Sequence, residues 1–373
     1  MTTTLNNVAD GPPLVGDGAR PGRDAFTRRF PLIAQRRPAC TPLAPRVAEL
    51  CGQAREAART GVAADVAAAH NQAALIASDC GAPDLAARWC LRQLELGLRP
   101  HPLDAASARL ALAPVTNLAR LHLRADEGAA AFALLDGLVT AVETGAPADV
   151  LGVGLPADLL DSPRTRREVV EWLRRNLRTI AVRAHVAEGR WTEAHEWLAA
   201  RGPLGARMLE DRQVAVLARA ERGDADGALA LLAATAPGER WEAAVTACLT
   251  ARHLPGTRVP PLDVTEPGLA VFHTRLGLST IDVDDRAAAE VTARLLVIAT
   301  RDGYAAREVL AHERAREHLT ARQVHELSAL VGECGLDAGA VPPALLADLT
   351  SALAGAEHVL ASHRGDPLPL AQP

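Results

Sequence analysis

One helix–turn–helix plan occurs four times between residues 73 and 233, and it restricts the fold more than any other feature. In each copy an apolar helix runs into a turn, an Ala follows five residues later, and a large apolar residue comes three residues after the Ala. The turn residues are Gly81, Asp126, Gly189 and Gly223; the alanines are Ala86, Ala131, Ala194 and Ala228; the large residues are Trp89, Leu134, Trp197 and Leu231. A Gly or Asp ends a helix, and the small Ala lets the next helix fold back closely against it. The four copies therefore predict antiparallel helical hairpins.

The composition agrees with a helical protein. Aromatic residues make up 3% of the chain, and the apolar residues are largely Ala, Leu and Val. Ala and Leu favour helices, whereas strands favour the β-branched and aromatic residues that are scarce here. The 373 residues also exceed the usual size of one compact core. We therefore expect an all-α protein in which antiparallel hairpins stack in series as a solenoid.

The sequence before the repeats has a different character. Residues 1–42 are rich in Gly, Pro and Thr and show no sustained period, which predicts a disordered or loosely docked arm. Between Arg20 and Arg46 this arm carries seven arginines against the single acid Asp24. Two interpretations are open: a docking arm for an acidic partner, or a solvated tail.

The repeats and the sequence after them predict one helical body. Residues 43–253 hold the repeats, and a Pro-rich break lies at 254–267. We expect residues 254–363 to extend the same body and residues 364–373 to form a frayed tail. Helical patterning after the break predicts helices at 268–277, 286–301, 304–317, 320–335 and 343–362.

Charge and hydropathy exclude some classes of partner. There are 40 basic and 45 acidic side chains, a net charge of -5, so the composition does not indicate a protein that binds nucleic acid by neutralising phosphates. No segment reaches the about 18 uninterrupted apolar residues that a membrane-spanning helix requires. The first thirty residues lack the apolar core of a secretory signal. We expect a cytoplasmic protein without direct nucleic-acid or membrane partners.

Metal and cofactor motifs are absent from the sequence. There is no P-loop, G-x-S-x-G, H-E-x-x-H or glycine-rich dinucleotide loop. The six cysteines form no C-x-x-C pair, and none has a His at zinc-ligand spacing. We therefore predict no metal site and no cofactor, and we expect buried cysteine thiols.

The last two turns, at Gly189 and Gly223, are 34 residues apart, which is the tetratricopeptide period. Residues 62–236 accordingly resemble the tetratricopeptide-repeat family. The match is incomplete, because the family's small residue twelve positions before the second-helix Ala is replaced by Val182 and Val216 in the later pairs. The resemblance implies that the first helices of successive hairpins line a concave face, where ligands lie.

The family's register, carried over onto this sequence, gives a row of polar positions on that face: Asn71, Thr116, Arg120, Thr179, Arg183 and Gln213. The resemblance implies that the amide side chains hold the backbone of an extended peptide and that the guanidinium groups bind carboxylates. The alternative is coincidence, because Arg is frequent in this chain.

A second resemblance involves the segments HNQAALIASDCG, LARLHLRADEG, AEGRW, EDRQVAVLARAERGD and RWEAAVTACL. Together they look similar to helical proteins of high-GC actinobacteria, including the helical accessory or cyclase component of class V lanthipeptide biosynthesis. This resemblance implies that the groove binds a ribosomal precursor peptide and assists addition of its Cys thiol to a dehydrated residue, without a metal. That reaction needs a base, a proton donor and a group that stabilises an enolate. The candidates are His70, Asp79, His122, His185 and Arg212, with Arg120 and Arg183.

Structural roles are open for the same residues. His122 and His185 occupy equivalent places in two repeats and can bridge helices, and Asp79 can end a helix. We therefore keep three functional hypotheses. The first is a protein that binds an extended peptide or partner segment, the second is the thioether-forming enzyme, and the third is a ligand-sensing regulator.

Overall fold

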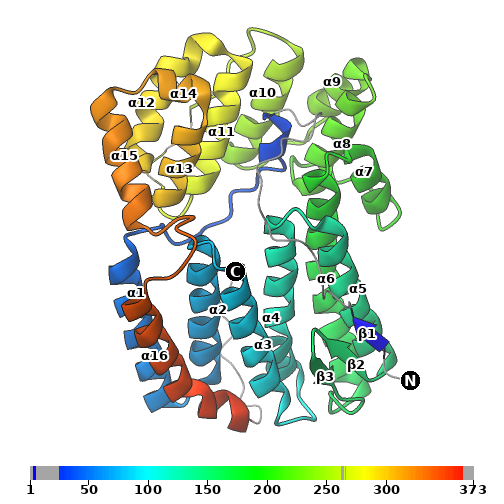
Figure 1. Ribbon diagram of the computed structural model, residues 1–373. Coiled ribbons are helices and arrows are strands. Elements are labelled where there is room, and N and C mark those ends of the chain that lie inside the picture. Colours follow the sequence, from blue (N-terminus) through cyan, green and yellow to red (C-terminus); the bar gives the residue numbers. More distant parts are fainter. Residues whose placement is uncertain (1–2, 6–24, 262–263, 265, 364–373) are drawn as a thin grey trace. The chain divides into compact units, whose positions relative to one another are not determined.

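The computed structural model describes residues 3–5, 25–261, 264 and 266–363 (Figure 1). The described chain is largely helical and has only three short strands, which confirms the predicted all-α class. Its residues group into two compact units. Of the described residues, the first unit holds 3–5, 44–188 and 337–363, and the second holds 25–43, 189–261, 264 and 266–336.

The first unit contains the N-terminal helices, the C-terminal helix and three short strands. Its helices are α1 (Leu43–Thr60), α2 (Ala63–Asp79), α3 (Pro83–Leu98), α4 (Ala105–Arg124), α5 (Gly128–Thr144), α6 (Pro163–Ala187) and α16 (Pro343–Ser362). Helices α2 to α6 pack on each other in consecutive pairs, and α4 also contacts α2 and α6. Helices α2, α4 and α6 therefore form one layer, with α3 and α5 in a second layer.

The four predicted turns are present. They separate α2 from α3, α4 from α5, α6 from α7 (Trp191–Ala199), and α8 (Glu210–Glu221) from α9 (Ala225–Ala233). All four turn residues have left-handed backbones, with φ between 59° at Asp126 and 76° at Gly189. Ala86, Ala131, Ala194 and Ala228 are all 0% exposed. The small residue thus lies in the packed interior at every turn, as the repeat predicts.

We expect Ala131→Leu to lower the free energy of unfolding by about 1–3 kcal/mol, because the fully buried site on α5 has no space for three more carbons. Chemical unfolding followed by circular dichroism measures this. Ala129, exposed on the same helix, provides the control: Ala129→Leu changes the free energy of unfolding by less than about 0.5 kcal/mol. Equal effects of the two substitutions would contradict the packing at Ala131.

The C-terminal helix α16 completes the first unit (Figure 1). It packs on α2 and α3, and Leu360 and Val359 join Leu96 of α3 in one buried cluster. Arg92 of α3 forms two hydrogen bonds with the Glu357 carboxylate, of 3.0 and 2.5 Å. By length and composition alone, α16 is the one helix in the described part of the chain that could cross a membrane. Six of its residues are buried within this unit: Leu349, Ala352, Leu353, Ala356, Val359 and Leu360.

The first unit also contains a small sheet that the helical pattern does not predict: two of its strands lie between α5 and α6 in the chain, and the third lies in the predicted N-terminal arm. Strand β2 (Ala148–Val150) pairs antiparallel with β3 (Val153–Leu155) and parallel with β1 (Thr3–Leu5). Three-residue strands are too short to produce a detectable alternation in the sequence. They were therefore missed by the analysis of periodicity.

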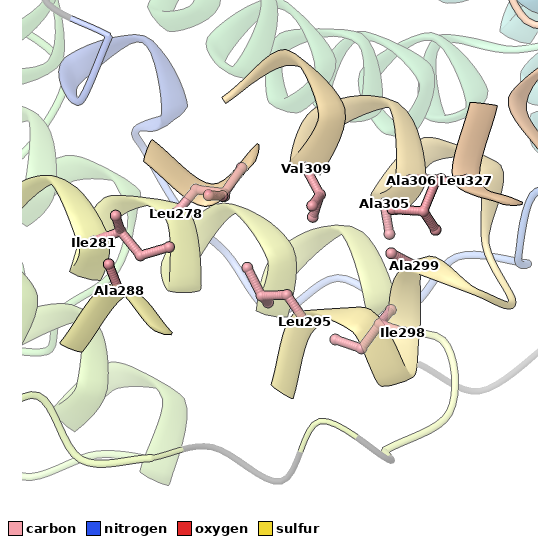
Figure 2. Packing of buried hydrophobic residues seen from close by; sticks show 11 residues of the cluster. Leu278, Ile281, Ala288, Leu295, Ile298, Ala299, Ala305, Ala306, Val309 and Leu327 are labelled. Atoms are coloured by element: carbon pink, nitrogen blue, oxygen red, sulfur yellow. The ribbon is translucent and has the colours of Figure 1, made fainter. Parts of the chain in front are cut away.

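The second unit contains the remaining helices. After η1 (Thr27–Arg29) and α7–α9 come α10 (Arg240–His253), α11 (Ala270–Val283), η2 (Asp285–Ala287), α12 (Ala288–Ala299), α13 (Gly303–Ala311), α14 (Glu313–Glu317) and α15 (Ala321–Glu333). Figure 2 shows its core, in which Leu278 of α11, Leu295 of α12 and Val309 of α13 pack together. The Pro-rich stretch that begins at residue 254 lies inside this unit, between α10 and α11.

The helix predicted at 304–317 is divided into α13 and α14 at His312. The His312 Nδ1 atom accepts a hydrogen bond from the Ala315 backbone N–H, so this side chain caps α14. Because Nδ1 accepts, Nε2 carries the proton that is donated to Asp282, 3.1 Å away. A His acting as an N-cap is rare, and the periodicity of the sequence gave no indication of it.

The predicted N-terminal arm is described at residues 3–5, which form β1, and at residues 25–42, which are packed within the second unit. Phe26, Phe30 and Leu32 are each at most 3% exposed. Arg29 pairs with Asp282 of α11, with 2.5 Å between nitrogen and oxygen. At the other end of the segment the Cys40 carbonyl accepts a hydrogen bond of 2.8 Å from the Gly303 N–H. Residues 6–24 of the predicted arm and the predicted tail at 364–373 lie outside the described residues.

Candidate functional site

The first unit brings three of the predicted groove residues onto one layer of helices. Asn71 of α2, Arg120 of α4 and Arg183 of α6 are all exposed. Thr179, one turn before Arg183, is half-buried. Thr116 is 4% exposed, and among the described residues its hydroxyl has no hydrogen-bond partner. Thr116 therefore packs inside the unit, and the prediction that it contacts a ligand is wrong.

A chain of amide hydrogen bonds connects α2 with α4. The Asn117 side chain donates from Nδ2 to the Asn71 Oδ1 atom at 2.5 Å. The Asn117 Oδ1 atom in turn accepts from Arg120 Nη1 at 2.9 Å. Asn71 and Arg120 therefore belong to one connected polar surface, to which Asn117 contributes the link.

A second polar group lies further along the same helices. Arg124 of α4 donates to the Ser78 hydroxyl at 2.5 Å and approaches the Asp79 carboxylate at 3.4 Å. Arg46 of α1 approaches the other oxygen of Asp79 at 3.6 Å. The Asp79 side chain is 3% exposed. Asp79 is thus a buried counter-ion between two arginines, and it does not point into solvent as a free base would.

The exposed arginines give this layer a positive character. The pKa of the Arg120 guanidinium is lowered, first because surrounding protein displaces water from it and then because Arg183 and Arg124 are also positive. Arg120 and Arg183 form no ion pair within the described residues. We call the surface made by Asn71, Leu75, Asn117, Arg120, Arg124 and Arg183 the α2–α4–α6 face.

Gln213 does not belong to this face. It lies in the second unit and is 0% exposed. Its side chain accepts a hydrogen bond from the Leu32 N–H at 2.7 Å and donates to the Leu32 carbonyl at 2.8 Å. The predicted chemistry, an amide that holds extended backbone, is present, but the backbone belongs to the same chain. The prediction that Gln213 contacts a separate peptide is therefore wrong.

Arg212, a candidate for the enolate-stabilising group, is also buried in the second unit. Its guanidinium donates to the carbonyl oxygens of Gly205 and Leu231, both at 2.8 Å, and to the Thr235 hydroxyl at 3.0 Å. All three nitrogens are thereby used to hold loops and a helix end in place. Arg212 has a structural role.

His70, a candidate base, is buried on α2 at 1% exposure. Burial lowers the pKa of its imidazole to about 4, which outweighs the opposing effect of nearby Glu357 and adds to that of Arg92. Among the described residues, neither ring nitrogen has a hydrogen-bond partner. A neutral imidazole shielded from solvent cannot reach a substrate proton.

The other two candidate histidines lie near the ends of their helices. His122 contacts the Glu127 carboxylate through Nδ1 at 2.7 Å and so links the end of α4 to the start of α5. His185 is half-buried in the last turn of α6. Their predicted alternative role, as residues that connect neighbouring helices, agrees with the contact of His122.

Two members of the face were missed by sequence reasoning, Asn117 and Arg124. Each could have been found by helical geometry, since positions three before and four after Arg120 lie on its side of α4. Ser78, which the Arg124 side chain contacts, lies on α2 seven residues after Asn71 and therefore on the same side of that helix.

The described residues show neither a cluster of metal ligands nor an exposed thiol. In the parts of the chain that the structure describes, no three His, Cys, Asp or Glu residues gather as a metal site. All six cysteines are buried. Burial raises the pKa of the Cys90 and Cys248 thiols to about 12, so both stay protonated at neutral pH.

Comparison with known proteins adds no family assignment: no protein-family description, curated protein or solved structure matches this chain.

Proposed function

We propose that this chain is a binding protein of tetratricopeptide-like architecture, whose α2–α4–α6 face holds an extended segment of a peptide or partner protein. One observation carries the proposal: Arg120 and Arg183, from neighbouring helices, are exposed on one surface and form no ion pair among the described residues. Like charges held close together raise the energy of the unbound face, and an anionic ligand relieves this repulsion.

The neighbouring side chains suit an extended polypeptide. Asn71 and Asn117 present amide groups that can pair with a peptide backbone. Leu75, on the same side of α2 as Asn71, is 41% exposed and presents apolar surface beside that amide. The face therefore offers an amide, an apolar contact and guanidinium groups in one row.

We expect Arg120→Ala combined with Arg183→Ala to weaken binding of acidic peptides at least about tenfold, because each charge-assisted hydrogen bond contributes about 1.5–3 kcal/mol. An array of immobilised peptides that alternate Glu with apolar residues, compared with the same array carrying Gln, measures this.

Arg164→Ala combined with Arg175→Ala is the matched control. Both arginines lie on α6, are exposed and pair with a Glu four residues away, so this variant loses the same charge without touching the face. If the Arg120/Arg183 variant binds the Glu peptides as tightly as the control variant does, the proposed binding face is rejected.

A further inference from the structure

We propose that the α2–α4–α6 face recognises a phosphoryl group, carried by a phosphorylated segment of the bound peptide or partner. This inference rests on the proposed function and specifies its ligand. It follows from the number and placement of charges on the face.

The first step is the charge balance. Four guanidinium groups, those of Arg46, Arg120, Arg124 and Arg183, belong to this part of the first unit, and Asp79 is the acid that contacts two of them. That single carboxylate is shared by Arg46 and Arg124 and is buried. The face therefore keeps an excess of positive charge.

Other acids close to these helices, among them Asp126 after α4 and Asp337 beside Asp79, have contacts of their own. Glu127 is bonded to His122. Glu188, beyond the end of α6, lies against the start of α5 at Gly128 and has contacts of its own. In the described part of the chain none of these acids forms an ion pair with Arg120 or Arg183, so an anionic ligand can supply the compensating charge.

The second step is the geometry of the donors. Arg120 and Arg124 are four residues apart and lie on one side of α4, while Arg183 extends from the adjacent α6. Three guanidinium groups thus approach the face from two helices. Each presents several N–H donors in a planar fork.

The third step compares the possible anions. A carboxylate brings one charge and two oxygens, which one guanidinium fork can satisfy. A phosphoryl group brings a charge of about -1.5 to -2 and three strong acceptor oxygens. The three guanidinium groups carry more positive charge than the local carboxylates neutralise, so they can balance the charge of a phosphoryl group. They also provide enough N–H donors for its three oxygens.

The test uses the full-length protein and inorganic phosphate. The Nε–Hε signals of its arginines are followed by NMR as phosphate is added at constant ionic strength. We expect saturable shifts of the Arg120, Arg124 and Arg183 signals, and weaker shifts at the same concentration of acetate. Arg183→Gln should weaken phosphate binding about tenfold or more, because charge-assisted hydrogen bonds of about 1.5–3 kcal/mol are lost.

Arg175→Gln, on the same helix and paired with Glu171, is the control and leaves the phosphate affinity unchanged. Three results would overturn the inference: acetate binding as tightly as phosphate, Arg183→Gln binding phosphate normally, or no saturable shift at all. The outcomes also separate the two proposals. Acidic peptides that bind while phosphate does not would leave the proposed function standing and remove this inference. Phosphate that binds while no peptide does would remove the proposed function instead.

Discussion

Gln213→Ala is expected to lower the free energy of unfolding of the second unit by about 2–4 kcal/mol, because it leaves two buried backbone groups of Leu32 without partners. Loss of a single backbone hydrogen bond would lower the free energy of unfolding by less. Here both the N–H and the carbonyl of Leu32 are bonded to the Gln213 side chain. Leu32 is 3% exposed, so water does not replace the amide unless the segment moves. Urea unfolding followed by circular dichroism gives the change in free energy.

Limited proteolysis gives a second, local measurement. Residues 25–42 contain several arginines, so loosening of this segment in Gln213→Ala should accelerate tryptic cleavage after Arg36, whereas the bond between Arg37 and Pro38 resists trypsin. Gln72→Ala, an exposed site on α2, serves as the control and should change neither measurement. Unchanged unfolding and unchanged cleavage in Gln213→Ala would show that its two hydrogen bonds are not needed to hold the segment.

The sequence predicted the local features of the fold most accurately. The turns at Gly81, Gly189 and Gly223 and the buried Ala residues depend on contacts between residues close in the chain, and such contacts leave a repeating pattern. The helix at 343–362 was predicted with the bounds that α16 has. Its packing on α2 and α3 is a long-range contact, which no local pattern encodes.

Long-range contacts also explain the errors at the candidate site. Gln213 was predicted from its register as a residue that holds extended backbone, and the structure shows an amide doing so. Its partner is Leu32, 181 residues away, so the sequence could not identify which segment is held. Asn71, Arg120 and Arg183 lie on exposed helix surfaces, which helical spacing alone predicts, and their contact with a peptide stays a prediction. The thioether-cyclase and ligand-sensing hypotheses stay predictions.

His70→Leu is expected to make the protein less sensitive to acid. The buried imidazole has a pKa of about 4, compared with 6.5 for an ordinary His, because burial disfavours its charged form. The unfolded state therefore binds a proton as the pH falls through 6.5, whereas the folded state does so only near pH 4. Since the unfolded state binds more protons in this window, the stability of the native protein falls with decreasing pH, by about 3 kcal/mol in total for this residue.

Leu has a volume similar to that of His and does not titrate, so His70→Leu should lack this part of the acid loss. Between pH 7.5 and pH 5 we expect the wild-type protein to lose about 2 kcal/mol more than the variant. At pH 7.5 the variant should also be more stable by about 1–3 kcal/mol, because it removes two buried nitrogens that have no hydrogen-bond partner among the described residues. Urea unfolding at several pH values measures both effects.

The exposed His358 of α16 provides the control for this experiment. His358→Asn should retain the wild-type dependence of stability on pH, because its ring is not buried. Parallel pH profiles for the wild-type protein and His70→Leu would contradict a neutral, buried His70. They would instead require a partner that keeps the imidazole charged, for which the nearest candidate is Glu357, already bonded twice to Arg92. Because the Glu357 carboxylate is already paired with Arg92, a charged His70 beside it would be stabilised less than in an isolated ion pair. Burial therefore determines the protonation state of His70.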